Sequence, residues 1–247
     1  MTQAEAVQAT IENLGGVATL GQINQDIFKI TECKWGAKDP FATIRRIVRH
    51  NTQGIYRIKP GLYGLESHRK QLEANGYIVE TPLNKNSKAL DDFNHYYYQG
   101  LLVEFGNMKG LKTFVPDQDK NRMFLHKARL GDLRSLKKIP PYTYPHLVKR
   151  SSTIDVIWFN ERSMPHSYFE VEHSTDIQNS LLKFEDLQDF NVRMLIVADN
   201  SRRQAFERKK AEAAFKPISR RVDFLSYETL VTQYELEVTM QSMELRL

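Results

Sequence analysis

The sequence has almost no cysteine and no long apolar run. Its single cysteine, Cys33, excludes an intrachain disulfide and any zinc site built from cysteine. No stretch approaches the ~20 apolar residues of a membrane-spanning helix. The first residues also lack the basic and then apolar pattern of a secretory signal peptide. We therefore expect a cytoplasmic protein with no membrane segment.

Length and composition are those of an ordinary globular chain. The 247 residues suffice for one large domain or two small ones, and 41% of them are hydrophobic and 26% charged. A net charge of +5 permits a polyanionic partner, although many basic proteins bind none. The positive charge is therefore informative only where it clusters.

The first 66 residues follow a pattern of three helices and then a hairpin. Apolar residues recur with helical spacing over residues 4–14 and 20–30, and Asp39-Pro40 predicts the start of a third helix. The turn Lys59-Pro60-Gly61 separates two short apolar segments, which is typical of a β-hairpin. This order is that of a winged helix, in which the third helix is the recognition helix that contacts DNA.

Three motifs of this segment resemble the HARE-type winged-helix domains, which are linked to DNA-associated proteins. They are the junction Leu14-Gly15-Gly16, the helix entry Asp39-Pro40, and the segment 61–65. The resemblance implies that residues 1–66 form a DNA-binding domain. The alternative for its basic residues is a solvated helix face, and any one arginine is expected to contact phosphate rather than a base. The residues expected to contact DNA are Arg45, Arg46, Arg49, His50, Arg57 and Lys59.

Residues 67–90 are polar and turn-prone and are predicted to form a linker, and a second domain is predicted over residues 91–247. Its expected order is α-β-β-β-α-β-α-β, which indicates an α/β fold with a mixed sheet flanked by helices. The basic stretch 117–150 fits a solvated insertion and a DNA-gripping arm equally well. The elements are expected near residues 91–107, 112–116, 153–158, 168–172, 176–189, 193–198, 201–215 and 222–225.

Two glutamates one residue apart, Glu170 and Glu172, share one face of a predicted strand, and Asp155 lies on the neighbouring strand. Adjacent carboxylates on an otherwise apolar strand are costly unless a cation lies between them. The apolar neighbours Ile154 and Val171 argue against the alternative, three unrelated surface carboxylates. A divalent cation held by three carboxylates is typical of the active site of a phosphodiester nuclease.

These residues and the element order resemble the PD-(D/E)XK superfamily, whose fold many restriction endonucleases share. Asp155 and Glu170 match its acidic positions, and Glu172 stands where lysine is usual, as in a known Glu-X-Glu variant. The resemblance implies Mg²⁺ held by Asp155 and Glu170, with Glu172 as general base or ligand of a second metal. It also implies a further acidic ligand from the first helix, for which Glu104 is the candidate.

Lys183, on the helix after the glutamate strand, could supply the missing lysine. The alternative is a side chain that extends past its apolar neighbours to solvent. The sequence thus predicts a Mg²⁺-dependent type II restriction endonuclease that cuts double-stranded DNA as a homodimer. A non-catalytic DNA-binding regulator on an inactive nuclease fold and a structure-specific repair nuclease are the alternatives.

Overall fold

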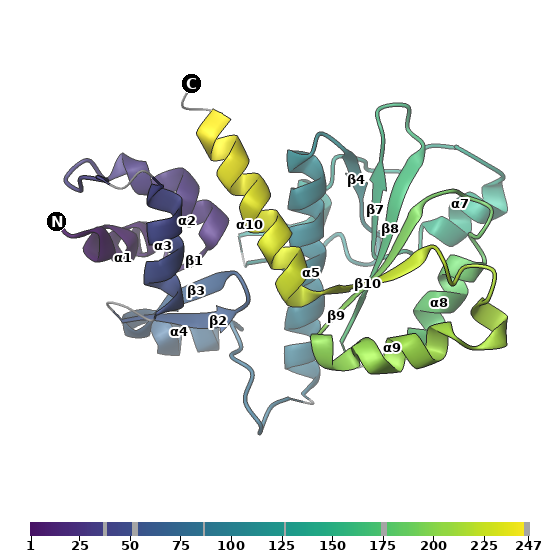
Figure 1. The fold of residues 1–247 in the computed structure, drawn as a ribbon, viewed down its shortest axis with the longest axis horizontal. Coiled ribbons are helices and arrows are strands. Elements are labelled where there is room, and N and C mark those ends of the chain that lie inside the picture. Colours follow the sequence, from purple (N-terminus) through teal and green to yellow (C-terminus); the bar gives the residue numbers. More distant parts are fainter. Residues whose placement is uncertain (37–38, 51–53, 86, 126, 174–176, 245–247) are drawn as a thin grey trace. The chain divides into compact units, whose positions relative to one another are not determined.

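The computed structural model describes residues 1–247 except 37–38, 51–53, 86, 126, 174–176 and 245–247. The chain forms two compact units (Figure 1), one of residues 1–93 with 231–247 and the other of residues 94–230. Helices α5 (Lys88–Met108) and α10 (Tyr227–Glu244) each contribute residues to both units. Among the helices in the described part of the chain, none is both long and apolar enough to cross a lipid bilayer.

The first unit combines short helices with a three-stranded antiparallel sheet in the order β1-β3-β2. The three helices and the hairpin expected from the sequence are confirmed. Residues 231–247 also belong to this unit, which the sequence pattern did not indicate; the domain limits 1–66, 67–90 and 91–247 stay predictions. The elements before residue 94 are α1 (Gln3–Asn13), β1 (Val17–Thr19), α2 (Leu20–Asp26), α3 (Pro40–Arg49), β2 (Ile55–Lys59), β3 (Leu62–Leu65) and α4 (Arg69–Ala74).

Local sequence sets where these helices begin. Helix α1 starts with a capping box, in which the Thr2 hydroxyl accepts a hydrogen bond from the Glu5 backbone and the Glu5 carboxylate accepts one from the Thr2 backbone. Asp39 caps the N-terminus of helix α3, and its side chain accepts a hydrogen bond from the backbone N–H of Ala42. Pro40 follows at the first helical position, where its missing N–H costs nothing.

The C-terminal part of α10 packs against α2 in the first unit. A Cβ atom on Gly21 would lie 3.0 Å from the Val238 side chain, so a larger residue there would require the Val238 side chain to shift. Asn24 is buried beside Thr239, with 3.5 Å between the amide nitrogen and the hydroxyl. Helix α10 is therefore part of the core of the N-terminal unit.

The second unit is built on a five-stranded sheet in the order β10-β9-β8-β7-β4. Strands β8, β9 and β10 are parallel, and β4, β7 and β8 are antiparallel neighbours. The predicted mixed sheet is confirmed. The strands are β4 (Lys112–Phe114), β7 (Val156–Phe159), β8 (Pro165–Glu172), β9 (Arg193–Ala198) and β10 (Val222–Ser226).

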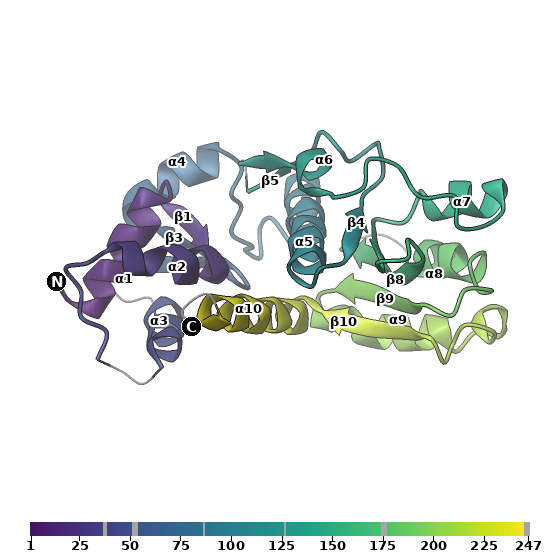
Figure 2. The same ribbon diagram turned by 90° about the horizontal axis from the view of Figure 1, so that it is seen from above.

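Helices cover both faces of this sheet (Figure 2). On one face, the Trp158 indole donates a hydrogen bond to the Leu102 carbonyl of α5 at 2.9 Å and packs on Phe105. On the other, Tyr168 shares a buried core with side chains from α8 (Ile177–Glu185) and α9 (Arg203–Lys210). The predicted start of the helix at residue 176 lies outside the described residues.

The basic stretch between β4 and β7 contains ordered elements, namely the hairpin β5 (Met123–Phe124) and β6 (Ala128–Arg129) and the helices α6 (Leu130–Leu133) and α7 (Pro145–Ser151). Arg134 is buried and donates hydrogen bonds to the Val115 carbonyl and the Asp117 carboxylate. The exposed basic residues of the stretch are Lys120, Arg122, Lys127, Arg129, Lys137, Lys138 and Lys149.

Candidate metal centre and nucleic-acid interface

The pairing of β7 with β8 places Asp155 beside Glu170. Val156 pairs with Phe169, so Asp155, the residue before β7, lies opposite Glu170. The Asp155 backbone N–H donates to Glu170 Oε1 at 3.3 Å, and the Val171 N–H donates to Asp155 Oδ2 at 2.8 Å. Asp155 is 8% exposed and Glu170 is 2% exposed. The two residues lie next to each other as the sequence predicted, although Asp155 is just before β7 and not within it.

Helix α8 completes this site from the face of β8 that carries Glu170 and Glu172. The Ser180 hydroxyl donates hydrogen bonds to both glutamates, at 2.9 Å to Glu170 Oε2. The Lys183 ammonium lies 2.7 Å from Glu170 Oε2 and 3.0 Å from the Thr153 carbonyl oxygen. The Lys183 side chain therefore contacts the acidic site, although its catalytic role stays a prediction.

Burial and the neighbouring charges shift the pKa values of Glu170 and Lys183 in this site. Burial raises the pKa of the Glu170 carboxyl well above its usual range, and the negative charge of Asp155 raises it further, against the opposing effects of Lys183 and Ser180. Burial lowers the pKa of Lys183, but the carboxylates, Glu170 first, outweigh it and raise that pKa above its ordinary value. The Asp155, Glu170 and Glu172 carboxylates are all buried, and each of them acts on the Lys183 ammonium. Buried carboxylates side by side fit a divalent cation between Asp155 and Glu170.

A second group of side chains approaches Asp155 from α5 and from the loop after β4. The His95 Nδ1 atom lies 3.1 Å from the Val171 carbonyl oxygen, and its Nε2 lies 4.0 Å from Asp155 Oδ2. The Gln99 amide donates to Asp119 Oδ2 at 3.2 Å and to the Asp155 carbonyl at 2.8 Å. Candidate ligand atoms of His95, Asp119 and Asp155 all lie within 4.8 Å of one another.

Sequence reasoning missed His95, Gln99 and Asp119. His95 and Gln99 are four residues apart, so they share one face of a helix, and this spacing was the available clue. Burial raises the pKa of Asp119 and the Asp155 charge raises it further, whereas the Gln99 hydrogen bond, His95 and Arg122 act in the opposite direction. A buried aspartate in a polar, turn-rich loop has no sequence pattern of its own.

Two further carboxylates, Glu104 and Glu172, were also predicted to belong to the site. Glu104 is on α5 as predicted, but it lies about 140° around the helix from Gln99. Helix α5 therefore presents His95 and Gln99 to Asp155, and a metal-binding role for Glu104 stays a prediction. Glu172 lies at the end of the central strand β8 and is only 5% exposed.

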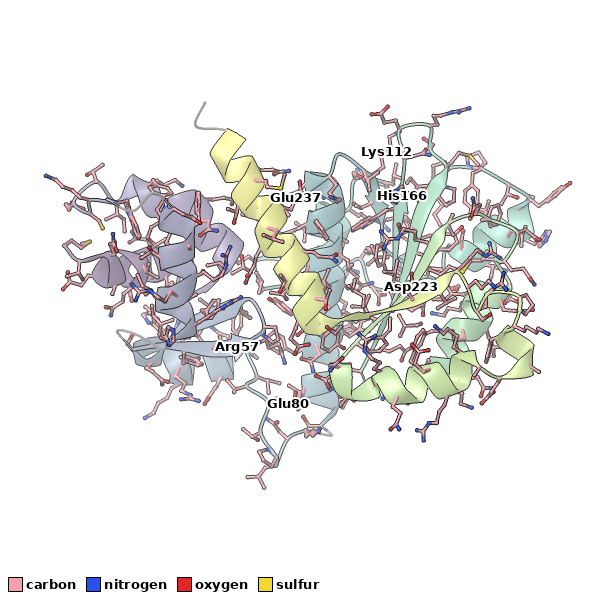
Figure 3. The ribbon with its side chains drawn as sticks, in the orientation of Figure 1. Arg57, Glu80, Lys112, His166, Asp223 and Glu237 are labelled. Carbon is pink, nitrogen blue, oxygen red and sulfur yellow. The ribbon has the colours of Figure 1, made fainter. Side chains whose placement is uncertain are left out.

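The basic residues of the first unit fall into two sets. Arg46 and His50 are exposed and line a hollow of about 310 Å³ together with Gln3, Ala4 and Ile47. Arg57 is exposed on β2 (Figure 3). These side chains are available to a polyanion.

Arg45 and Arg49 have a carboxylate partner within the protein. The Glu235 carboxylate of α10, whose side chain is 4% exposed, lies 3.9 Å from Arg45 Nε and 3.7 Å from an Arg49 guanidinium nitrogen. Burial raises the pKa of Glu235, and Arg49, Arg45 and Arg57 oppose this rise. These two arginines therefore also stabilise α10 in the unit.

Lys59 is not placed like a DNA contact. It is 5% exposed, and its ammonium lies 4.9 Å from the centre of the Phe93 ring. Burial lowers the pKa of Lys59 to about 8, partly offset by Glu80. A DNA contact of Lys59 therefore stays a prediction.

Comparison with known proteins places the chain in a family of restriction-enzyme C-terminal domains. The chain belongs to the family of the type II restriction enzyme NmeDI C-terminal domain, whose model matches residues 80–245. The type II restriction enzyme NmeDI of Neisseria meningitidis serogroup C is 25% identical over 152 residues, which cover 58% of this chain and 42% of that protein. The chain thus spans less than half the length of this curated relative. No solved structure matches the chain.

Proposed function

We propose that this protein is a divalent-metal-dependent DNA endonuclease of type II restriction character, with Mg²⁺ held by Asp155 and Glu170. The observation that carries the proposal is that the buried Asp155 and Glu170 side chains adjoin each other at β7 and β8, with the Lys183 ammonium of α8 2.7 Å from Glu170. An aspartate, a glutamate and a lysine at one point are the set expected of a PD-(D/E)XK nuclease. Membership in a restriction-enzyme family supports the same reading.

Each residue has a task that follows from its chemistry. A bound divalent cation would supply Lewis-acid activation of the scissile phosphate and of a water molecule. Asp155 and Glu170 would hold it through oxygen ligands. Lys183 would place a positive charge where negative charge grows on the phosphate. Glu172 would accept a proton from the attacking water, with the Ser180 hydroxyl holding its carboxylate in place.

The N-terminal unit would act as a winged helix that docks on DNA through α3. Arg46 and His50 on its exposed side, with Arg57 on β2, would contact phosphates. The hollow that Arg46 and His50 line with the first turn of α1 adds the positive end of a helix dipole to this surface. Arg45 and Arg49 would contribute to the same positive field while they pair with Glu235.

The hairpin β5–β6 would give the second unit a DNA contact of its own. Lys120, Arg122, Lys127 and Arg129 are exposed around it, and Asp119 in the adjoining loop is buried near Asp155. Exposed positive charge close to buried carboxylates is the arrangement expected when a polyanion must approach an acidic site. Of the two interpretations of residues 117–150, we propose the DNA-gripping arm.

Because one site cuts one strand, cleavage of both strands would require two copies, and we propose a homodimer. A monomer that cuts both strands in sequence would be revealed by nicked plasmid as a long-lived intermediate. Sedimentation of the protein with and without DNA measures the oligomeric state directly.

The test is cleavage of plasmid and genomic DNA by purified protein, with Mg²⁺ and with EDTA. We expect Asp155→Ala to abolish cleavage and to leave DNA binding intact, because the substitution removes a metal ligand and no phosphate contact. Asp223→Ala, which removes an exposed carboxylate from β10 (Figure 3), is the matched control and should cut as the parent does. Undiminished cleavage by Asp155→Ala would sink the proposal. Bound but intact DNA over a range of divalent metals would instead support a DNA-binding regulator.

A further inference from the structure

The His95 imidazole is held in an orientation that turns one nitrogen towards Asp155. Its Nδ1 lies 3.1 Å from the Val171 carbonyl oxygen, which can only accept a hydrogen bond, so Nδ1 carries the proton. In the neutral ring, Nε2 then presents a lone pair. That lone pair faces Asp155 Oδ2, another electron-rich atom, and the pair is stable only if a cation or a proton lies between them.

The separation of the two atoms favours a cation over a direct hydrogen bond. Nε2 and Oδ2 are 4.0 Å apart, whereas a charge-assisted N–H···O hydrogen bond spans about 2.7–2.9 Å. Two ligands at about 2.0–2.2 Å from one metal ion lie at most about 4.4 Å apart. The geometry therefore fits a metal ion with His95 and Asp155 on either side of it.

The Gln99 carboxamide gives an independent indication of a missing ligand. Gln99 is fully buried, and its amide nitrogen donates to Asp119 and to the Asp155 carbonyl. Its Oε1 atom is buried and has no hydrogen-bond partner among the residues that the structure describes. A half-turn of the carboxamide would bring Oε1 towards the same two oxygens, which is favourable only if a cation lies between them.

Burial makes the uncompensated charge of this cluster costly. Asp119 is 7% exposed and Asp155 is 8% exposed. Among the charged side chains that act on Asp119, Arg122 is exposed to solvent, and the negative charge of Asp155 raises the pKa of Asp119 further. A divalent ion would neutralise both carboxylates at once.

We propose that His95, Asp119 and Asp155 bind a divalent first-row transition-metal ion, with Gln99 Oε1 as a further ligand. Asp155 would be shared with the Mg²⁺ site proposed at Glu170, and His95 and Asp119 would belong to the second ion alone. An imidazole ligand favours ions such as Mn²⁺, Co²⁺ or Zn²⁺, whereas Mg²⁺ prefers oxygen ligands and retains its waters. The Val171 carbonyl acts as the outer partner that orients a metal-binding histidine.

This site goes beyond the proposed function, since binding of the ion needs neither DNA nor cleavage. Metal-free full-length protein is titrated with Mn²⁺, and bound Mn²⁺ is followed by electron paramagnetic resonance. Pulsed measurements detect the coupling of Mn²⁺ to a directly bound imidazole nitrogen. The same measurements are made on His95→Gln, Asp119→Asn and Glu170→Gln.

The control is His166→Gln, the same substitution at an exposed histidine near the start of β8, the opposite end of the strand from Glu172 (Figure 3). Asp119→Asn keeps the shape of the buried side chain, and His95 is only partly buried, with its side chain 28% exposed. Circular dichroism and thermal unfolding in EDTA show whether each variant folds.

We expect nitrogen-coupled Mn²⁺ in the parent protein, in His166→Gln and in Glu170→Gln, and its persistence in hundredfold excess Mg²⁺. His95→Gln should lose the nitrogen coupling, and both it and Asp119→Asn should bind Mn²⁺ about 10–100-fold more weakly. The inference is overturned if Mn²⁺ bound to the parent protein shows no nitrogen coupling, or if the coupling survives in His95→Gln. Absence of coupling in the parent protein would mean that a protonated His95, and not a metal ion, lies beside the two aspartates. Nitrogen-coupled Mn²⁺ without DNA cleavage would overturn the proposed endonuclease and leave this site standing.

Discussion

The Lys183 ammonium lies 2.7 Å from the Glu170 carboxylate, although the two residues are 13 positions apart and on different elements. The lysine usual in the PD-(D/E)XK motif would stand two residues after Glu170, where this chain has Glu172. Helix α8 packs against β8, and its fourth residue, Ser180, and its seventh, Lys183, reach the strand. An ammonium group thus reaches the acidic site from the helix instead of the strand.

Lys183→Met should reduce DNA cleavage by roughly 10²–10³-fold, because it removes the positive charge beside the reacting phosphate. DNA affinity in EDTA should be unchanged, since Lys183 already pairs with Glu170. Cleavage rates under single-turnover conditions measure the effect. Lys216→Met, the same substitution at an exposed lysine outside the acidic site, is the matched control. Parent-like cutting by Lys183→Met would assign the lysine a purely structural role.

Glu170→Gln should stabilise the metal-free protein against unfolding. The folded-state pKa of Glu170 is raised above its ordinary value of 4.5, so the folded protein holds more protons there than the unfolded chain. Stability contributed by this group is therefore lost as the pH rises above about 4.5. Urea unfolding in EDTA should show an advantage of Glu170→Gln that grows between pH 4.5 and pH 7. Glu228→Gln, at an exposed site, should show no such trend.

Arg46→Ala and Arg45→Ala should separate DNA binding from stability. Arg46 is exposed, so its loss should weaken double-stranded DNA binding and reduce the slope of log affinity against log salt by about 1. Arg45 lies 3.9 Å from the buried Glu235 carboxylate, so its loss should lower the free energy of unfolding by about 1 kcal/mol. Fluorescence anisotropy over a salt series and urea unfolding measure the two effects. Equal effects of both variants on salt dependence would contradict this division.

Lys59→Met should stabilise the protein at pH 7 by on the order of 1–3 kcal/mol, because it removes a buried charge. The pKa of Lys59 is about 8 in the folded protein against 10.5 ordinarily, so the unfolded chain binds more protons between these values. Parent stability should accordingly rise from pH 8 towards pH 10.5 relative to Lys59→Met. Urea unfolding at pH 7 and pH 10 measures this difference, and Lys70→Met on the exposed side of α4 is the control.

Patterns within one strand or helix predicted much of the fold. Alternation of side chains along residues 168–172 put Glu170 and Glu172 on one face, and both contact Ser180 in the structure. The apolar run Arg193–Ala198 is the strand between two parallel neighbours, as its composition predicted. Such features depend on neighbours in sequence, so periodicity captures them.

Contacts between distant segments could not be read in this way. His95 precedes three tyrosines, so its run resembles helix packing, yet it meets Val171 across 76 positions. Glu104 is the acidic residue in the apolar part of α5, but it lies on a different side of the helix from Gln99. The pairing of Glu235 with Arg45 and Arg49 joins two ends of the chain and has no local pattern.

Gly21 and Val238 lie in contact although nearly the whole chain separates them. On the ribosome α2 emerges well before α10, so the surface of α2 that receives α10 stays open until α10 has been synthesised. Folding of the first unit is therefore delayed until α10 has emerged, whereas the strands of the second unit's sheet emerge earlier. Cotranslational protease protection should consequently appear for residues 94–230 before it appears for residues 1–93.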